Sequence, residues 1–209
     1  MLLALPLAAK AEPLRRVLFI GNSFTHEHDV PALVATLAAQ ARRPIEPHVV
    51  VRNGARLAGH LRREIVRQTL TWGWEAVVLQ DHSTEALHPA RLSETESALA
   101  LADRLSGEAA LVLFTPWPRA AGHPLYARLA GVSGRLAPET PAEMARLTTA
   151  QAKALAARQG ATVAPVASAW AAALEEGQSL HTVDGYHANP AGAALSARVL
   201  WETLAKVLP

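Results

Sequence analysis

Apolar residues along the chain fall into short continuous runs that alternate with longer stretches of helical periodicity. The short runs are rich in β-branched and aliphatic residues and predict strands at 17–20, 45–51, 75–79, 109–114 and 162–167. The longer stretches predict helices at 31–40, 57–70, 92–105, 141–159, 168–176 and 190–207. Strands that alternate with helices favour a parallel sheet with helices on both faces, because right-handed crossovers place them there.

Residues 15–209 contain no internal repeat and no low-complexity linker, so we expect a single domain there. Residues 1–11 differ, since they form an apolar run that ends in Ala9-Lys10-Ala11, a pattern typical of a signal-peptide cleavage site. A positively charged segment before the run is missing. We interpret residues 1–11 as a minimal or truncated export signal, with an exposed apolar arm as the alternative. The expected location is periplasmic or secreted, or else cytoplasmic if the run is an arm.

Composition excludes several classes of function. The formal net charge is only +2, and no basic stripe interleaved with aromatic residues occurs, so nucleic acid is not an expected partner. The absence of cysteine rules out disulfides, thiolate metal sites and a cysteine nucleophile. No apolar run approaches the roughly 18 residues that a transmembrane helix needs. His26 and His28 lie one residue apart in a polar stretch and are expected to be solvated rather than metal ligands.

The first predicted strand runs directly into Gly21-Asn22-Ser23. In open α/β sheets, ligands bind at the carboxyl ends of the strands, which places Ser23 where a nucleophile would be useful. The alternative is that Ser23 only caps the helix that follows, because serine and asparagine favour such positions.

A second group of polar residues, Asp184-Gly185-Tyr186-His187, lies just before the helix start at Asn189-Pro190. If the backbone makes one turn, a spacing of three places Asp184 and His187 on the same side. A carboxylate could then accept the imidazole Nδ1–H while Nε2 faces outward, as in the base half of a nucleophilic triad. The alternative is that both residues are helix caps.

Three segments together resemble the SGNH (GDSL-like) hydrolases. Gly21-Asn22-Ser23-Phe24-Thr25 is similar to the first block of that family, in a Gly-Asn-Ser variant. Asn53-Gly54-Ala55-Arg56-Leu57 is similar to the glycine block, and the segment from Asp184 to His187 is similar to the last block. The resemblance implies a flavodoxin-like three-layer α/β/α sandwich with a five-stranded parallel sheet. It also implies Ser23 as nucleophile, His187 as base and Asp184 as the residue that orients the base.

The resemblance further implies an oxyanion hole made by the backbone N–H groups of Ser23 and Gly54 and one side-chain amide. The chain departs from the family pattern at that amide, because Gln80-Asp81-His82 stands where the family usually has Gly-x-Asn-Asp. Gln80 carries the same amide on a longer side chain and is the expected donor, with His82 as the second candidate. A misplaced donor costs roughly 3 kcal/mol in the barrier.

These observations predict a serine hydrolase that cleaves acyl esters through an acyl-enzyme intermediate, without metal or organic cofactor. The substrate is expected to be a small-molecule or carbohydrate ester, with deacetylation of carbohydrate as one option. Asn22, His82 and Trp117 are the candidate substrate contacts. Residues 116–140 are rich in proline and glycine and are interpreted as a loop that lines the site, although Trp117 and Tyr126 could equally be packed against the body.

The alternative function is a binding module for carbohydrate or acyl ligands that keeps the fold but has little or no activity. The altered segment at Gln80 motivates this alternative. The oligomeric state is left open by the sequence.

Overall fold

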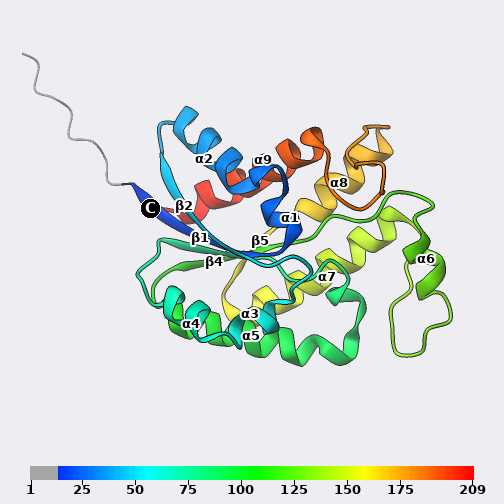
Figure 1. The fold of residues 1–209 in the computed structure, drawn as a ribbon, viewed down its shortest axis with the longest axis horizontal. Coiled ribbons are helices and arrows are strands. Elements are labelled where there is room, and N and C mark those ends of the chain that lie inside the picture. The colour runs from blue at the N-terminus through cyan, green and yellow to red at the C-terminus, as the bar shows by residue number, and fades with distance from the viewer. Residues whose placement is uncertain (1–13) are drawn as a thin grey trace, which may run out of the picture.

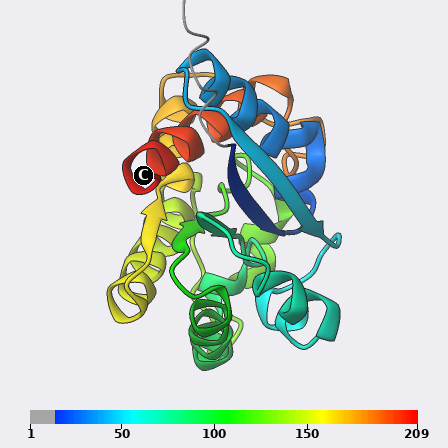
Figure 2. The ribbon, with the colours of Figure 1, turned by 90° about the vertical axis from the view of Figure 1, so that its left-hand side faces the viewer.

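The computed structural model describes residues 14–209, so the predicted export signal at residues 1–11 lies outside the described residues. The described chain forms a five-stranded parallel sheet in the order β2-β1-β3-β4-β5. The strands are β1 (Arg15–Gly21), β2 (Ile45–Val51), β3 (Ala76–Leu79), β4 (Ala110–Phe114) and β5 (Thr162–Ala164). Seen along its edge, the sheet has helices on both sides (Figure 2). The predicted three-layer α/β/α fold class is therefore confirmed.

Helices of the two outer layers come from different parts of the chain (Figure 1). One face is covered by α2 (Val30–Gln40), α8 (Val166–Glu175) and α9 (Pro190–Val207). The other is covered by α3 (Leu57–Leu61), α4 (Glu64–Leu70), α5 (Leu92–Ser106) and α7 (Pro141–Gln159). Each layer buries its own apolar core against the sheet.

Strand β1 shows why its sequence is a continuous apolar run rather than an alternating one. Val17 and Phe19 pack into the core on the α2 side, while Leu18 and Ile20 pack into the core on the α5 side. A strand with both faces buried needs apolar residues at every position, which is typical of parallel sheets.

The predicted helix at 57–70 is two helices in the structure. Helix α3 ends at Leu61 and α4 begins at Glu64, because Arg63 has an extended conformation (φ −84°, ψ 125°). The break turns the second helix about its axis, so that Val66 is buried while Ile65 is 54% exposed. The apolar spacing continues across the break because both helices cover the same face of the sheet.

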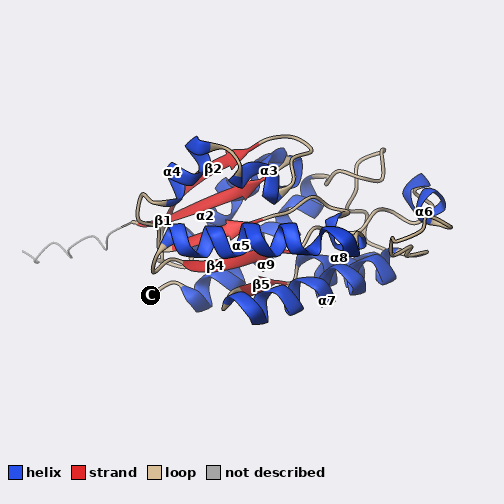
Figure 3. Cartoon of the chain, turned by 90° about the horizontal axis from the view of Figure 1, so that it is seen from below, coloured by secondary structure: helices blue, strands red, loops and turns tan. Residues whose placement is uncertain are grey.

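Short helical segments fill the connections at the carboxyl edge of the sheet. They are α1 (Ser23–His26), α6 (Pro124–Leu129) and the 3₁₀ helices η1 (Glu27–Asp29), η2 (Glu85–Leu87) and η3 (Pro89–Arg91). Helix α6 belongs to the proline- and glycine-rich segment 116–140 and lies at one end of the molecule (Figure 3). Strand β5 is shorter than predicted, and α8 begins at Val166 because Pro165 leaves the extended conformation (φ −83°, ψ 51°).

The strand order fixes where a site is expected. Strands β2 and β3 lie on opposite sides of β1, so the chain changes direction at β1. Open α/β sheets bind ligands in the crevice outside the carboxyl ends of the strands at such a switch point. Strand β1 ends at Gly21, directly before Asn22 and Ser23.

Candidate active site

The turn after β1 is held in place by the side chain of Asn22. Its Oδ1 accepts the backbone N–H of Phe24 at 3.1 Å, and its Nδ2 donates to the backbone oxygen of Ala55 at 3.0 Å. Asn22 thus caps helix α1 and ties it to the turn after β2. Ser23 is the first residue of α1 and is 4% exposed. Its hydroxyl makes no hydrogen bond to any residue that the structure describes.

Gln80 supports this turn from β3. It is fully buried, and its Oε1 accepts from the backbone N–H of Asn22 at 2.9 Å and from the hydroxyl of Thr25 at 3.0 Å. Its Nε2 donates to the backbone oxygen of Asp81. A Cβ on Gly21 would lie 2.6 Å from the Gln80 Oε1, so only glycine leaves room for this contact. The structure therefore places the Gln80 amide beneath the turn, with both ends occupied.

Asp184 and His187 meet in the loop before α9, as their spacing predicts. The Asp184 Oδ2 lies 2.7 Å from the Nδ1 of His187. The other carboxylate oxygen accepts the backbone N–H groups of Tyr186 and His187 and the hydroxyl of Thr182. Partial burial alone would raise the pKa of Asp184, but these hydrogen bonds outweigh it and hold the pKa well below its usual range. Asp184 is therefore a carboxylate at neutral pH.

The segment 116–120 anchors the loop that carries His187. The backbone oxygen of Tyr186 accepts the indole N–H of Trp117 at 3.0 Å, and the backbone oxygen of Gly185 accepts the N–H of Ala120 at 2.9 Å. The Trp117 ring is stacked between Phe24 and Trp170, with centroids 3.9 Å and 4.6 Å away. Trp117 is 1% exposed, so neither face of its ring is open to a ligand, and the structure favours the packing alternative for this residue. Tyr126 is also buried.

The outward nitrogen of His187 faces a carboxylate that the sequence did not point to. Its Nε2 lies 3.3 Å from the Oε1 of Glu27 in η1. The His187 ring is also close to the turn after β1, with its centroid 6.3 Å from that of Phe24. No hydrogen bond joins His187 to Ser23 within residues 14–209. Asp184 and His187 thus lie near the turn that carries Ser23, and the Nε2 of His187 faces the carboxylate of Glu27.

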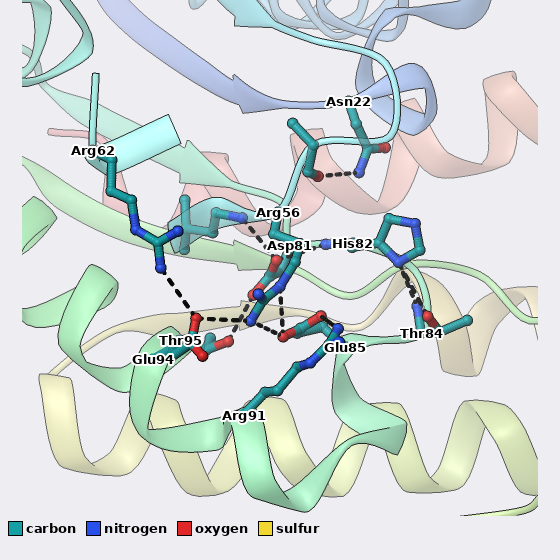
Figure 4. A network of polar contacts seen from close by, with 12 residues as sticks. Asn22, Arg56, Arg62, Asp81, His82, Thr84, Glu85, Arg91, Glu94 and Thr95 are labelled. Atoms are coloured by element: carbon teal, nitrogen blue, oxygen red, sulfur yellow. Dashed lines mark hydrogen bonds and ion pairs between the residues drawn. The ribbon is translucent and has the colours of Figure 1, made fainter. Parts of the chain in front are cut away.

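The segment after β3 forms a polar network around Asp81 (Figure 4). Asp81 accepts the backbone N–H groups of Leu57 and His82 and the hydroxyl of Thr95. Nearby, Arg56 pairs with the buried carboxylate of Glu85 and also contacts Glu94. Burial raises the pKa of Glu85, and the hydrogen bond from Arg56 opposes that shift. The network fixes the turn that carries Gly54 against the turn that carries His82.

The two nitrogens of the His82 ring have different roles: Nδ1 accepts hydrogen bonds, and Nε2 carries the ring proton. Its Nδ1 accepts the backbone N–H of Thr84 at 3.3 Å and also lies 3.1 Å from that residue's hydroxyl. Burial and the nearby charge of Arg119 lower the pKa of His82, so the ring is neutral at pH 7. With Nδ1 accepting, the single ring proton sits on Nε2. In Figure 4 the ring stands apart from the arginine–glutamate network.

Two backbone donors at the predicted oxyanion hole are uncommitted. The N–H groups of Ser23 and Gly54 donate to no other group in the described part of the chain. Gly54 has a positive φ of 67°, which glycine adopts without strain. Among residues 14–209 we find no cluster of histidine and acidic side chains that could hold a metal ion, and no helix long and apolar enough to span a bilayer.

Of the comparisons with known proteins, the one with solved structures gave matches. No family model and no curated protein matches the chain. Among solved structures, a Slackia heliotrinireducens protein assigned to the SGNH hydrolases is 28% identical, with a TM-score of 0.73, over 92% of this chain and 100% of its own. This similarity extends over nearly the whole chain and supports the resemblance to the SGNH (GDSL-like) hydrolases. The resemblance to this family that the sequence indicated is thereby confirmed.

Other solved structures share the fold at lower identity. The lipase/acylhydrolase from Enterococcus faecalis is 15% identical with a TM-score of 0.67, over 94% of this chain and 98% of its own. A DUF4886 family protein from Bacteroides uniformis is 17% identical with a TM-score of 0.67, over 93% of this chain and 84% of its own. These likenesses support the three-layer fold of the chain.

Proposed function

We propose that this SGNH-type protein hydrolyses acyl esters, with Ser23 as nucleophile, His187 as base and Asp184 as the residue that orients the base. The observation that carries the proposal is the 2.7 Å contact between Asp184 and the His187 Nδ1, beside the helix that Ser23 begins. A carboxylate at Nδ1 holds the imidazole in the tautomer whose Nε2 can take a proton. Serine needs such a base because its hydroxyl is a weak acid at neutral pH.

Proton transfer in this proposal requires the His187 Nε2 to exchange its contact with Glu27 for one with Ser23. The His187 Nε2 turns from Glu27 to the Ser23 hydroxyl, takes its proton, and later returns that proton to the leaving alcohol. Water then attacks the acyl-serine with His187 again as base, which releases the acid and restores Ser23. No metal or organic cofactor takes part in these steps.

The oxyanion of the tetrahedral intermediate is stabilised, in this proposal, by the N–H groups of Ser23 and Gly54. These donors support the assignment because they are otherwise unused. For the third donor we propose the Nε2–H of His82 in place of the Gln80 amide, which is fully buried beneath the turn and donates one of its two N–H groups to the backbone oxygen of Asp81. Gln80 and Asn22 then act by holding the turn rather than by touching the substrate.

A chromogenic acetate ester and a fluorophosphonate probe test the proposal together. We expect wild-type protein to hydrolyse the ester and to be labelled, and Ser23→Ala and His187→Ala to lose both properties. Ser97→Ala is a matched control, because its hydroxyl is exposed on α5 and bonds only to its own helix. Equal rates in wild type and Ser23→Ala, with no labelling, would refute the proposal and favour a binding module for carbohydrate or acyl ligands.

A further inference from the structure

A strongly basic pocket of about 440 Å³ opens beside the candidate active site. Three arginines line it, namely Arg119, Arg128 and Arg135, together with His82 and His123. No aspartate or glutamate is part of its lining. Burial, and then the charge of Arg119, lower the pKa values of His82 and His123, so both rings are neutral N–H donors at pH 7. The pocket thus offers three positive charges and no negative one.

Tyr186 connects this pocket to the catalytic dyad. Its ring lines the pocket and lies 4.0 Å, centroid to centroid, from the ring of His187. The guanidinium of Arg119 lies 3.8 Å from the centre of the Tyr186 ring and 5.6 Å from that of Phe24, the residue after Ser23. A ligand in the pocket is therefore one aromatic ring away from the proposed base, His187.

Arg119 is a buried side chain whose guanidinium group has one N–H-bearing nitrogen without a hydrogen-bond partner among the described residues. It is 5% exposed, and its Nη2 donates to the hydroxyl of Ser83 at 2.8 Å. Its Nη1 is buried and has no hydrogen-bond partner among the described residues. An unsatisfied N–H on a charged group is costly to bury, so binding of an anionic acceptor at Arg119 would be favourable. Burial lowers the pKa of Arg119 to about 10, so the group still carries its charge at neutral pH.

The neighbouring arginine Arg56 differs from the arginines of this pocket in its ion pairs. Arg56, on the other side of His82, is neutralised by the carboxylates of Glu85 and Glu94. Arg119, Arg128 and Arg135 form no ion pair within residues 14–209. A carboxylate or phosphate group matches the chemistry of this lining, because guanidinium groups bind both in a bidentate manner.

We propose that this pocket is an anion subsite, and that the ester substrates of this enzyme carry a carboxylate or phosphate group that binds Arg119 while the ester lies at Ser23. This inference rests on the proposed esterase activity for its catalytic readout. Anion binding to the pocket does not depend on that activity and can be measured separately. The substrate class is thus an anionic ester rather than a neutral lipid or a neutral acetylated sugar.

Matched ester pairs test the catalytic part. One pair is 4-acetoxybenzoate and its neutral methyl ester, and 4-acetoxyphenyl phosphate gives the phosphate arm. We expect kcat/KM to favour at least one anionic ester about tenfold or more, as a charge-assisted hydrogen bond would give. Mono-4-nitrophenyl adipate and its methyl ester repeat the comparison with the anion on the acyl side. Equal kcat/KM within all pairs would overturn the inference.

Arginine variants assign the preference to the pocket. Arg119→Gln removes the positive charge and keeps a polar amide, and is expected to abolish the preference for the anionic ester while the neutral ester is still hydrolysed. Arg128→Gln, which alters an exposed residue on α6, serves if Arg119→Gln fails to fold, and is expected to reduce the preference several-fold. Arg198→Gln on α9 removes one exposed charge elsewhere and is expected to leave it unchanged. An unchanged preference in Arg119→Gln, or in Arg128→Gln if Arg119→Gln does not fold, would overturn the inference.

Thermal unfolding of the Ser23→Ala protein tests binding without catalysis. We expect benzoate or inorganic phosphate to raise Tm, whereas benzamide, or chloride at equal ionic strength, does not. Stabilisation by benzamide equal to that by benzoate would overturn the inference. Anion binding without any ester hydrolysis would refute only the proposed function, whereas Ser23-dependent hydrolysis with no anion effect would refute only the subsite.

Discussion

Because Gly21 is closely packed, we predict that the Gly21→Ala variant is less stable than wild type. The added Cβ would lie 2.2 Å from the Thr25 Oγ1 and 2.6 Å from the Gln80 Oε1, so at least one of these atoms must move. Gln80 is held by the backbone N–H of Asn22, and Thr25 is held by Gln80. Any movement that relieves the overlap therefore breaks a buried hydrogen bond or shifts the turn that carries Ser23.

The expected loss combines two effects of known size. Overpacking in a filled site costs about 1–3 kcal/mol, and a buried donor left without a partner costs about 1–3 kcal/mol. Gly21→Ala should therefore lower the free energy of unfolding by about 2–6 kcal/mol. Such a loss is a large part of the 5–15 kcal/mol that is typical of a whole domain. We also expect a fall in esterase activity, because Ser23 is two residues away.

Urea denaturation at equilibrium measures the first effect, and the chromogenic ester assay measures the second. Gly59→Ala is the matched control, because a Cβ there meets no atom within 4 Å. Gly59 lies inside helix α3, where alanine is the better helix former, so this variant should be as stable as wild type or more stable by up to about 1 kcal/mol.

A double variant identifies the contact responsible. Adding Thr25→Ala removes the nearest obstacle, so Gly21→Ala should cost at least about 1 kcal/mol less in that background than in wild type. If Gly21→Ala is as stable and as active as wild type, the tight approach of Gly21, Thr25 and Gln80 does not hold the turn.

Three further predictions concern single side chains of the site. Gln80→Ala should lower the free energy of unfolding by about 2–4 kcal/mol, since it leaves the Asn22 N–H and the Thr25 hydroxyl unpaired; a fall in kcat with unchanged urea denaturation would instead support the oxyanion role. Asp184 has a pKa below its unfolded value, so its carboxylate adds stability above about pH 4 and loses that contribution as the pH falls. The stability difference between wild type and Asp184→Asn should thus shrink between pH 7 and pH 3, and a constant difference would contradict this account. Glu27→Ala frees the His187 Nε2 and should raise kcat/KM about two- to fivefold, whereas a tenfold fall would make Glu27 part of the catalytic machinery.

The fold could be predicted from the sequence because strands and helices place their apolar residues in different patterns: continuous runs in the strands and helical spacing in the helices. Residues 17–20 and 76–79 are apolar at every position, since the structure buries both faces of these strands. The break between α3 and α4 was missed, because apolar residues continue at helical spacing across Arg62 and Arg63. A local change of backbone direction leaves no mark in such a pattern when both helices pack on the same face.

Within the site, short-range geometry could be predicted and long-range contacts could not. The spacing of Asp184 and His187 was enough to predict their contact, because one turn of backbone determines it. The direction of the Gln80 amide depends on the space left by Gly21, 59 positions earlier in the chain. Glu27 and Arg119 were missed for the same reason, since nothing in their local sequence indicates what they face after folding.

The stack of Phe24, Trp117 and Trp170 gives the protein a built-in optical reporter. The two indoles are almost parallel, with an angle of 6° between planes, and the outer face of Trp117 lies against the ring next to Ser23. Tryptophan emission and near-ultraviolet circular dichroism therefore respond to the position of helix α1 without any added label. The proposed acylation of Ser23, if it displaces that helix, can be followed in real time by this intrinsic signal.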